Sequence, residues 1–404
     1  MKFKPSGGLN LYQHKEPAFS RDQRRLVSPK RIFIPIPDGK DVQKASAFID
    51  EAEYIGVSNF EYPGAEHARF GQFRPSGAGQ QGEDEIPYYD REKNAIVENI
   101  DFNDLVDVAR KAFIIDESDG RSLYKKFLGF RERRVNCLVA DAIDEEPYVS
   151  SKVNTLMKKG DQVADALSLA AGAFAAAKSF ALCYSHIDDT KTIVPSSIGG
   201  MHIRKISGKY PVKNRIENYT GKKDICGFIG VQALVHLYRA VYFGKKQSTT
   251  IITVAGDCIG YPCNVEVPIG TPVQEALEFC GLIRDPSQVV IMGSMSGTSI
   301  TNLQLPILHS TRSVIAFHVP AAGEEQPCIN CGKCNQVCPA GLSPSFIYKY
   351  GKYGYFARAE RLHPEKCIEC ACCSYICPAH LDLSYMVMQI KNRIAEKKPE
   401  SVNP

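Results

Sequence analysis

Nine of the 15 cysteines in this chain of 404 residues lie between Cys328 and Cys377, and no other feature constrains the fold as strongly. Within this run the spacing Cys-x2-Cys-x2-Cys-x3-Cys-Pro occurs twice. In such segments three thiolates on one loop bind one [4Fe–4S] cluster, and the fourth cysteine binds the cluster of the other segment. The spacing therefore predicts two clusters with exchanged ligands, one on Cys328, Cys331, Cys334 and Cys377 and the other on Cys367, Cys370, Cys373 and Cys338.

Other chemistries fit this cysteine run less well. A zinc site needs four ligands in two pairs, and two identical runs of four cysteines exceed that number. Residues 1–20 lack the apolar segment of a secretory signal. We therefore expect a reducing compartment, where crowded cysteines act as metal ligands rather than as disulfides.

The remaining cysteines and the histidines show no ligand pattern. Cys372 falls outside the repeated spacing, and we expect it to pack beside a cluster; a role as a spare ligand is the alternative. The nine histidines are scattered singly. Six other cysteines have no mutual ligand spacing and are expected to be buried apolar residues: Cys137, Cys183, Cys226, Cys258, Cys263 and Cys280.

Composition limits the class of protein. Hydrophobic residues make up 44% and charged residues 23% of the chain, and the net charge is only +4. A chain of this length and composition can bury two to four domain cores, and its charge balance gives no reason to expect a nucleic-acid partner. The most apolar window, residues 166–177, is shorter than the roughly 20 residues of a membrane-spanning helix.

Periodicity in the middle of the chain predicts an α/β layer with parallel strands. We expect a helix over 102–113, a strand over 135–140, a long helix over about 161–182 and a further helix over 230–243. Strands over 248–257 and 265–269, followed by a helix over 273–280, predict a small β-grasp-like module. Residues 31–36 indicate an arm entering a strand, and residues 38–90 have weak apolar periodicity.

With these elements in place, the chain resembles the C subunit of the Rnf electron-transport complex, a family related to the flavin-carrying subunit of respiratory complex I. The resemblance rests on the cysteine run, the Gly7-Gly8 arm and the acidic turn from Asp141 through Asp144, Glu145 and Glu146 to Tyr148. Lys209-Tyr210-Pro211 and the glycine box at 293–297 match in the family's order.

The resemblance implies an α/β multidomain fold. Its parts would be an N-terminal arm with a degenerate barrel or hammerhead-like region (1–95), a Rossmann-like domain of the complex I flavoprotein type (96–246), an SLBB-like β-grasp module (247–312), an α-helical ferredoxin-like domain for the two [4Fe–4S] clusters (313–396) and a tail (397–404). It also implies partners: the other subunits of a membrane redox complex, and ferredoxin or a flavoprotein as electron donor.

Departures from the family pattern concern the flavin site. Members that carry flavin have a glycine-rich loop whose N–H groups approach FMN. Here the stretch 119–127 has one glycine, Gly120, and the aromatic residues Tyr124 and Phe127, which with Leu123 are expected to fill the pocket; residues 212–215 have also changed. Asp141 stands where the family has Asn. We therefore expect a degenerate site at Gly120, Asp141, Asp144 and Glu146 that has lost FMN; ordinary loop drift with FMN retained is the alternative.

These inferences converge on an electron-transfer subunit, peripheral to the cytoplasmic side of the cell membrane, in which no residue does acid–base catalysis. Two alternatives remain open: an FMN-dependent NADH oxidoreductase resembling the cobalamin reductases, and a soluble iron–sulfur donor to one reductase. The basic stretch 121–134 predicts a docking face for an acidic partner such as ferredoxin, or otherwise a solvated face.

Overall fold

The computed structural model describes residues 7–35, 52–62, 65–75, 100–185, 194–212, 216, 220, 223–318 and 323–397. The domain boundary expected near residue 95, residues 213–215 of the altered box and the tail beyond residue 397 lie outside the described residues. The helices and strands are α1 (Glu16–Phe19), β1 (Arg24–Arg25), β2 (Ile32–Pro35), β3 (Ala52–Tyr62), β4 (Ala65–Pro75), α2 (Phe102–Lys111), α3 (Leu123–Glu132), β5 (Cys137–Ala142), α4 (Ser151–Ala173), β6 (Lys178–Tyr184), β7 (Ser197–Ile198), β8 (Met201–Ile206), β9 (Cys226–Gly230), α5 (Val231–Phe243), β10 (Thr249–Ala255), β11 (Cys263–Pro268), α6 (Val273–Phe279), β12 (Gln288–Ile291), β13 (Thr298–Ile300), β14 (Ser313–Phe317), α7 (Lys333–Val337), α8 (Pro344–Lys352), α9 (Phe356–Glu360), the 3-10 turn η3 (Pro364–Lys366), α10 (Cys372–Tyr375) and α11 (Leu383–Lys397).

The α/β domain is built on a five-stranded sheet in the order β7-β8-β6-β5-β9. Its four long strands are parallel, and only the edge strand β7 is antiparallel. Alternate residues of a strand face opposite sides of a sheet: Leu138 and Ala140 of β5 enter the core shared with α2–α5, whereas Cys137 and Val139 enter a smaller core on the other face. Every residue of β5 is buried, as is typical of parallel strands.

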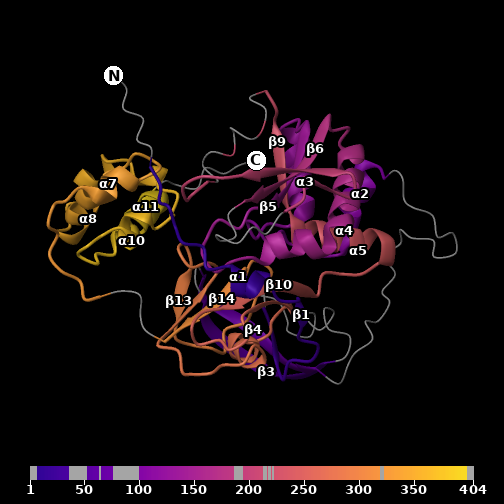
Figure 1. Ribbon diagram of the computed structural model, residues 1–404, viewed down its shortest axis with the longest axis horizontal. Coiled ribbons are helices and arrows are strands. Elements are labelled where there is room, and N and C mark those ends of the chain that lie inside the picture. Colours follow the sequence, from indigo (N-terminus) through magenta and orange to yellow (C-terminus); the bar gives the residue numbers. More distant parts are fainter. Residues whose placement is uncertain are drawn as a thin grey trace.

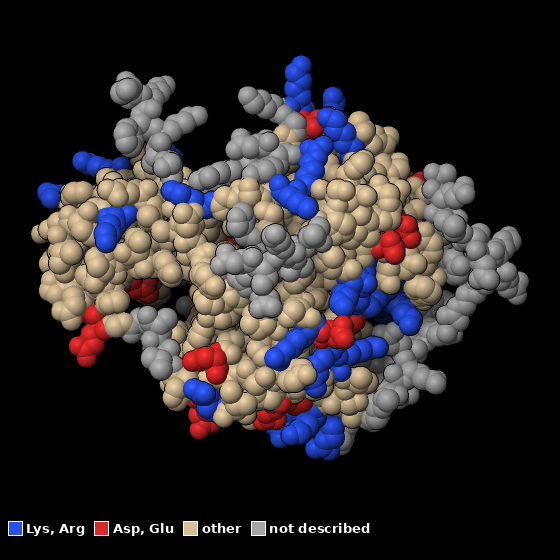
Figure 2. Space-filling model, in the orientation of Figure 1, with Lys and Arg blue, Asp and Glu red and all other residues tan. Residues whose placement is uncertain are grey.

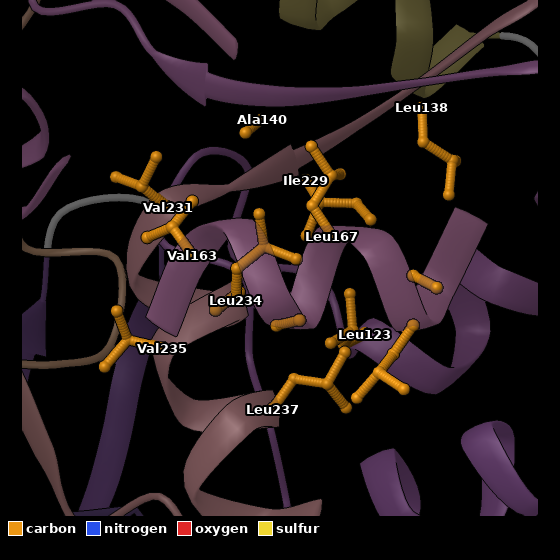
Figure 3. Packing of buried hydrophobic residues seen from close by; sticks show 14 of the residues in the cluster. Leu123, Leu138, Ala140, Val163, Leu167, Ile229, Val231, Leu234, Val235 and Leu237 are labelled. Carbon is orange, nitrogen blue, oxygen red and sulfur yellow. The ribbon is translucent and has the colours of Figure 1, made fainter. Parts of the chain in front are cut away.

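The helices α4 and α5 fix the carboxyl edge of this sheet, where the acidic turn begins. Figure 3 shows Val163 and Leu167 of α4 and Leu234 of α5 pointing toward one another beneath the strands. This apolar contact places the amino ends of both helices next to the turn that follows β5. The electrostatics of the site follow from that placement, because a helix amino end carries unpaired N–H groups.

One expected element differs from the structure. The helix expected over 161–182 begins at Ser151, with a kink at Lys159, and ends at Ala173; residues 178–184 form strand β6 instead. Residues 166–182 are mostly apolar, with Lys178 and Ser179 among the exceptions, and such a run does not distinguish a helix from a buried strand. Strand β6 pairs in parallel with β5, so tertiary pairing decided the outcome.

The β-grasp module has a six-stranded mixed sheet in the order β1-β11-β10-β14-β12-β13, with α6 packed on it. Beside it lies a three-stranded antiparallel sheet, β2-β4-β3, whose long hairpin β3–β4 the weak periodicity of residues 38–90 did not predict. Phe33 and Phe70 join this sheet to the core of the β-grasp module. In Figure 1 the cysteine-rich helices α7–α11 form a separate lobe beside both domains.

Candidate metal centres and a buried charged network

Each cysteine run forms a tight loop followed by a short helix, α7 or α10. The third residue of each run has a positive φ, 57° at Asn330 and 59° at Glu369, and so does the fifth, 72° at Gly332 and 56° at Ala371. The two loops therefore repeat the same backbone turns as well as the same spacing. Glycine adopts this left-handed conformation at little cost, whereas Ala371 is strained in it.

Three cysteines of the first run and the last cysteine of the second line one cavity of about 120 Å³. This is the set predicted for the first cluster: Cys328, Cys331, Cys334 and Cys377. Cys334 is buried and Cys331 is exposed, so the cavity opens to the surface on one side. Four thiolates around a largely apolar cavity form a donor set that suits a [4Fe–4S] cluster.

Cys338 lies with the first three predicted ligands of the second run. The pKa of the Cys373 thiol is raised, first by burial and then by the charges of Cys370, Cys367 and Cys338. Burial also raises the pKa of Cys338, and the charge of Cys370 adds to the effect. Such mutual repulsion disfavours a group of bare thiolates and favours a bound cationic centre.

The geometry fits iron–sulfur clusters better than a single ion. Among the described residues, no three His, Cys, Asp or Glu side chains converge closely enough to ligate one metal ion. A cubane separates its thiolate ligands more widely than one zinc ion does. Backbone N–H groups also donate to two of the sulfurs, Leu342 to Cys338 at 3.3 Å and Glu369 to Cys367 at 3.4 Å.

Cys372 is fully buried and packs against Leu9 and Tyr210 rather than facing the cavity of the first group. Its Sγ lies 3.9 Å from the carbonyl oxygen of Tyr210. The Cys372 side chain also neighbours that of Cys370, and hydrogen bonding between the two lowers the pKa of Cys370 to about 7. The position agrees with the expectation that Cys372 packs beside the predicted ligands rather than among them.

The N-terminal arm joins the cysteine-rich lobe to the α/β domain. Gly8 N–H donates to the carbonyl of Val337 at 2.8 Å, and Leu9 and Tyr210 exchange two backbone hydrogen bonds. A Cβ on Gly7 would lie 2.6 Å from the carbonyl oxygen of Cys338, and one on Gly8, whose φ is 102°, would lie 2.5 Å from that of Tyr210. Glycine is needed at both positions because neighbouring backbone approaches each of them closely. The arm thereby holds the second group of cysteines, Cys338 with Cys367, Cys370 and Cys373, at the domain junction.

The six other cysteines lie away from these groups. Cys263 and Cys280 approach to 3.7 Å between sulfurs, a contact that their separation of 17 residues does not suggest. Cys137 and Cys226 are register partners on β5 and β9. All but Cys226, which is half-buried, are buried.

The acidic turn after β5 forms a buried charged network with α4. Lys152 Nζ lies 2.7 Å from Asp141 Oδ2 and 2.7 Å from Ser118 Oγ, and the lysine side chain is fully buried. Burial alone would lower the pKa of Lys152, but the carboxylates of Asp141 and Glu117 outweigh it and raise that pKa. Asp144 Oδ2 accepts hydrogen bonds from the first N–H groups of α4, at 2.8 and 3.0 Å.

Glu146 ties the same turn to the β-grasp module. Its carboxylate accepts from the N–H groups of Met295 and Ser296, at 2.8 and 3.1 Å, and from Ser296 Oγ at 2.6 Å. Arg312 lies 3.4 Å away. A Cβ on Gly293 would lie 2.3 Å from this carboxylate, so the glycine box makes room for Glu146.

A carboxylate from the loop before α3 occupies the amino end of α5. Glu117 accepts from the N–H groups of Gln232 at 2.9 Å and Ala233 at 3.0 Å. A Cβ on Gly230 would lie 2.3 Å from the Glu117 carboxylate, so the space that this glycine leaves is filled. Burial and then the charge of Asp116 raise the pKa of Glu117 to about 7.

This loop does not fit the phosphate of FMN. A phosphate needs converging N–H groups, and here Glu117 and Asp144 already accept from the amino ends of α5 and α4. Gly120 has a φ of 71°, but it stands alone. Leu123 and Phe127 are fully buried, yet they lie on α3 in the core of the domain, as ordinary helix residues rather than loop residues filling a pocket.

In the acidic turn and the first turn of α4, three buried polar atoms lack a hydrogen-bond partner among the described residues: Asp144 Oδ1, Ser151 Oγ and Asn154 Oδ1. Buried water commonly satisfies such groups. These three unpaired polar atoms lie at the position where the resemblance places a ligand.

The basic stretch 121–134 is only partly available for docking. Lys126 is nearly buried and pairs with Asp116 at 2.6 Å and Asp119 at 3.0 Å. Arg131 stacks on Phe102, 4.5 Å from the ring centroid. Most of the stretch forms helix α3, and the charge of Lys126 is neutralised by its partners, so the stretch is not a uniformly exposed basic surface.

Sequence reasoning missed the two groups that complete this network, Glu117 and Lys152. Neither belongs to a recognisable motif, and each meets its partner only through the fold: Glu117 contacts a helix more than 110 residues later. Lys15 of the N-terminal arm joins them, since it is buried and donates to the carbonyl of Asp144.

Comparison with known proteins matches two parts of the chain. A family model described as a 4Fe-4S dicluster domain matches residues 323–378, and the SLBB domain model matches residues 251–299. The chain is 28% identical over 242 residues to the C subunit of the ion-translocating oxidoreductase complex of Erwinia tasmaniensis, covering 54% of this chain and 30% of that protein. It is 24% identical over 406 residues to the C subunit of the proton-translocating ferredoxin:NAD(+) oxidoreductase complex of Clostridium ljungdahlii, covering 88% and 86%.

The chain thus spans less than a third of the length of the Erwinia relative and most of the Clostridium one. A solved structure, an NAD+-reducing [NiFe]-hydrogenase in the H2-reduced state, is 14% identical with a TM-score of 0.48, covering 74% of this chain and 64% of that chain.

The fold and the matched domains define a class of protein: an α/β domain joined to an SLBB module and a domain for two [4Fe–4S] clusters. Within that class the chain is RnfC-like, which confirms the resemblance expected from its motifs. The expected fold class is confirmed too, whereas the domain boundaries stay predictions. None of the helices in the described ranges combines the length and apolarity needed to cross a bilayer.

Proposed function

We propose that the chain is the electron-transfer iron–sulfur subunit of an Rnf-type or related oxidoreductase complex, peripheral to the cytoplasmic side of the cell membrane. The observation that carries the proposal is the cavity shared by Cys377 and the three cysteines 43 or more residues before it. Only a fold that exchanges the fourth ligand brings this set together. The similarity to C subunits of ion-translocating complexes supports the membrane partners.

In this proposal the chain holds and tunes redox centres rather than doing acid–base chemistry. Bound [4Fe–4S] clusters supply one-electron transfer. The cysteines hold them, and the N–H groups of Leu342 and Glu369 donate to ligand sulfurs, which raises the reduction potential. The α/β domain serves as a scaffold whose flavin site has been lost, because Glu117 and Asp144 occupy the helix amino ends.

Iron analysis with two matched variants tests the cluster assignment. Anaerobically purified protein should contain about eight irons. Cys338→Ser should damage the cluster of the second run and Cys377→Ser that of the first, each leaving the electron paramagnetic resonance (EPR) signal of the other. Bound zinc, about four irons in the unaltered protein, or damage confined to the run that carries the substitution would contradict the exchange.

A second candidate is an FMN-dependent NADH oxidoreductase of the same superfamily. The unpartnered oxygens of Asp144 and Asn154 favour it, because a bound ligand could supply their missing donors. Acid extraction of protein purified in the dark decides between the two: near-stoichiometric FMN, or bleaching of the clusters by NADH without a partner, would establish the flavoenzyme. Failure to co-purify with integral membrane subunits would instead favour a soluble iron–sulfur donor.

A further inference from the structure

The two groups of cysteines lie in different surroundings. The first group includes Cys331, the most exposed of the eight predicted ligands, at the mouth of its cavity. None of the second group is exposed, and Tyr210, Cys372 and the N-terminal arm pack against that side of the lobe. The first group is therefore the one that a protein partner can approach directly.

The rim of the first cavity carries uncompensated positive charge. Its charged lining residues are Lys333 and Lys349, with no acid among them. Lys349 donates to the neutral side chain of Asn330, and neither lysine forms a salt bridge within the described parts of the chain. At the second group the neighbouring Lys391 is paired with Glu369 at 2.6 Å.

Exposed apolar side chains lie beside these lysines. Ile329 is 67% exposed and Phe346 is 51% exposed, and both line the same cavity. An apolar centre with a charged rim is the usual composition of a protein interface. In Figure 2 basic side chains stand at the outer end of this lobe, with acidic ones at its lower edge.

We propose that the mouth of the first cavity, formed by Ile329, Lys333, Phe346 and Lys349, docks a small one-electron carrier protein with an acidic face. The proposal rests on the proposed function, since it presumes a redox centre in this cavity. Complementary charge accelerates encounter by roughly 10- to 1000-fold, and the effect falls with salt. Electron transfer weakens steeply with distance, so a carrier must dock beside a redox centre, and helix α3 carries none of the eight cysteines.

The test compares two double variants, each of which loses two positive charges. One carries Lys333→Gln and Lys349→Gln at the cavity, and the other carries Lys125→Gln and Arg131→Gln on α3. The probe is a dithionite-reduced acidic bacterial ferredoxin freed of excess reductant, and the second-order rate of cluster reduction is followed by stopped flow. The cavity variant should react about tenfold more slowly at low salt and converge with the unaltered protein at about 0.5 M salt. The α3 variant should stay within about twofold of the unaltered protein.

Equal slowing by both variants, slowing by the α3 variant alone, or no slowing at all would overturn the proposal. Rates are normalised to the EPR signal of the first cluster. The double variant Lys333→Arg and Lys349→Arg keeps both charges and should react at the rate of the unaltered protein. If the glutamine variant loses iron, Ile329→Ser supplies the test, and an unchanged rate in it would then refute the docking site. Failure of the proposed function is distinguished by iron analysis of the unaltered protein, which would then not contain two clusters.

Discussion

Breaking the buried ion pair between Lys152 and Asp141 should destabilise the α/β domain strongly. Their charged atoms lie 2.7 Å apart, and the side chains are 0% and 8% exposed. Replacing Lys152 by Met leaves a buried carboxylate without its counter-ion, which costs about 3–5 kcal/mol. Asp141→Asn leaves the ammonium beside a neutral amide in place of its counter-ion and should cost a similar amount.

The double variant should be much less destabilised than the sum of the two singles, by at least about 2 kcal/mol, because neither charge is then stranded. Since a chain of several domains does not unfold in two states, the assay is native-state amide exchange of α4 and β5, read by mass spectrometry. Lys178→Met provides the control: its pair with Asp224 is 2.9 Å long but its side chain is 52% exposed, so the loss should stay below about 1 kcal/mol. Additive effects of the single variants would show that the network is not the buried pair described above.

Three other predictions concern the cysteine groups, the arm and the network. Cys372→Ala should leave the iron content unchanged but lower the midpoint potential of the second cluster in redox titrations, because hydrogen bonding to Cys370 is lost. Loss of iron from this variant would instead make Cys372 a ligand. Gly8→Ala should loosen the lobe, measured as faster limited proteolysis, because its φ is 102° and a Cβ meets the Tyr210 carbonyl, whereas Gly129→Ala, which meets nothing within 4 Å, should not. The pKa of Glu117 rises from 4.5 to about 7 on folding, so the folded state binds the extra proton and the stability of the α/β domain should fall as pH rises from 4.5 to 7. Native-state amide exchange of α5, measured across this pH range, should show a flatter slope in Glu117→Gln.

The cysteine domain could be predicted closely because its information is local. Spacing within each run fixes which thiolates share a loop, and the repeated positive φ values at Asn330 and Glu369 follow from that loop. The exchange of Cys338 and Cys377 is likewise predicted from the motif, without knowledge of the fold, and it stays a prediction. The strand β6 could not be predicted, because its apolar residues gain their pairing only from β5.

The charged network was predictable in position but not in chemistry. The acidic turn marked where Asp141, Asp144 and Glu146 would lie, yet their partners come from distant segments: an α4 lysine, the glycine box near residue 295 and the arm. Hydrogen-bond satisfaction inside a buried site is a global property, because each group must find its donor wherever the fold brings one. Sequence reasoning expected large side chains to fill a vacated pocket, whereas in the structure the carboxylates of Glu117 and Asp144 accept from the amino ends of α5 and α4.

The two cysteine groups differ in exposure, so the lobe has an outer group and an inner one. The first group opens outward between Lys333 and Lys349, and the second lies against Tyr210, whose backbone the N-terminal arm also holds. Glu145 approaches the same junction, where its charge adds to that of Cys370. Negative charge around a cluster lowers its reduction potential, and the two lysines raise that of the first. At the second group the charge of Glu145 is opposed by the N–H groups of Leu342 and Glu369, which donate to its sulfurs and raise its potential. Under the proposed function the two clusters are thus tuned by different means, and electrons that enter at the exposed first group leave through the covered second group, at the junction with the α/β domain.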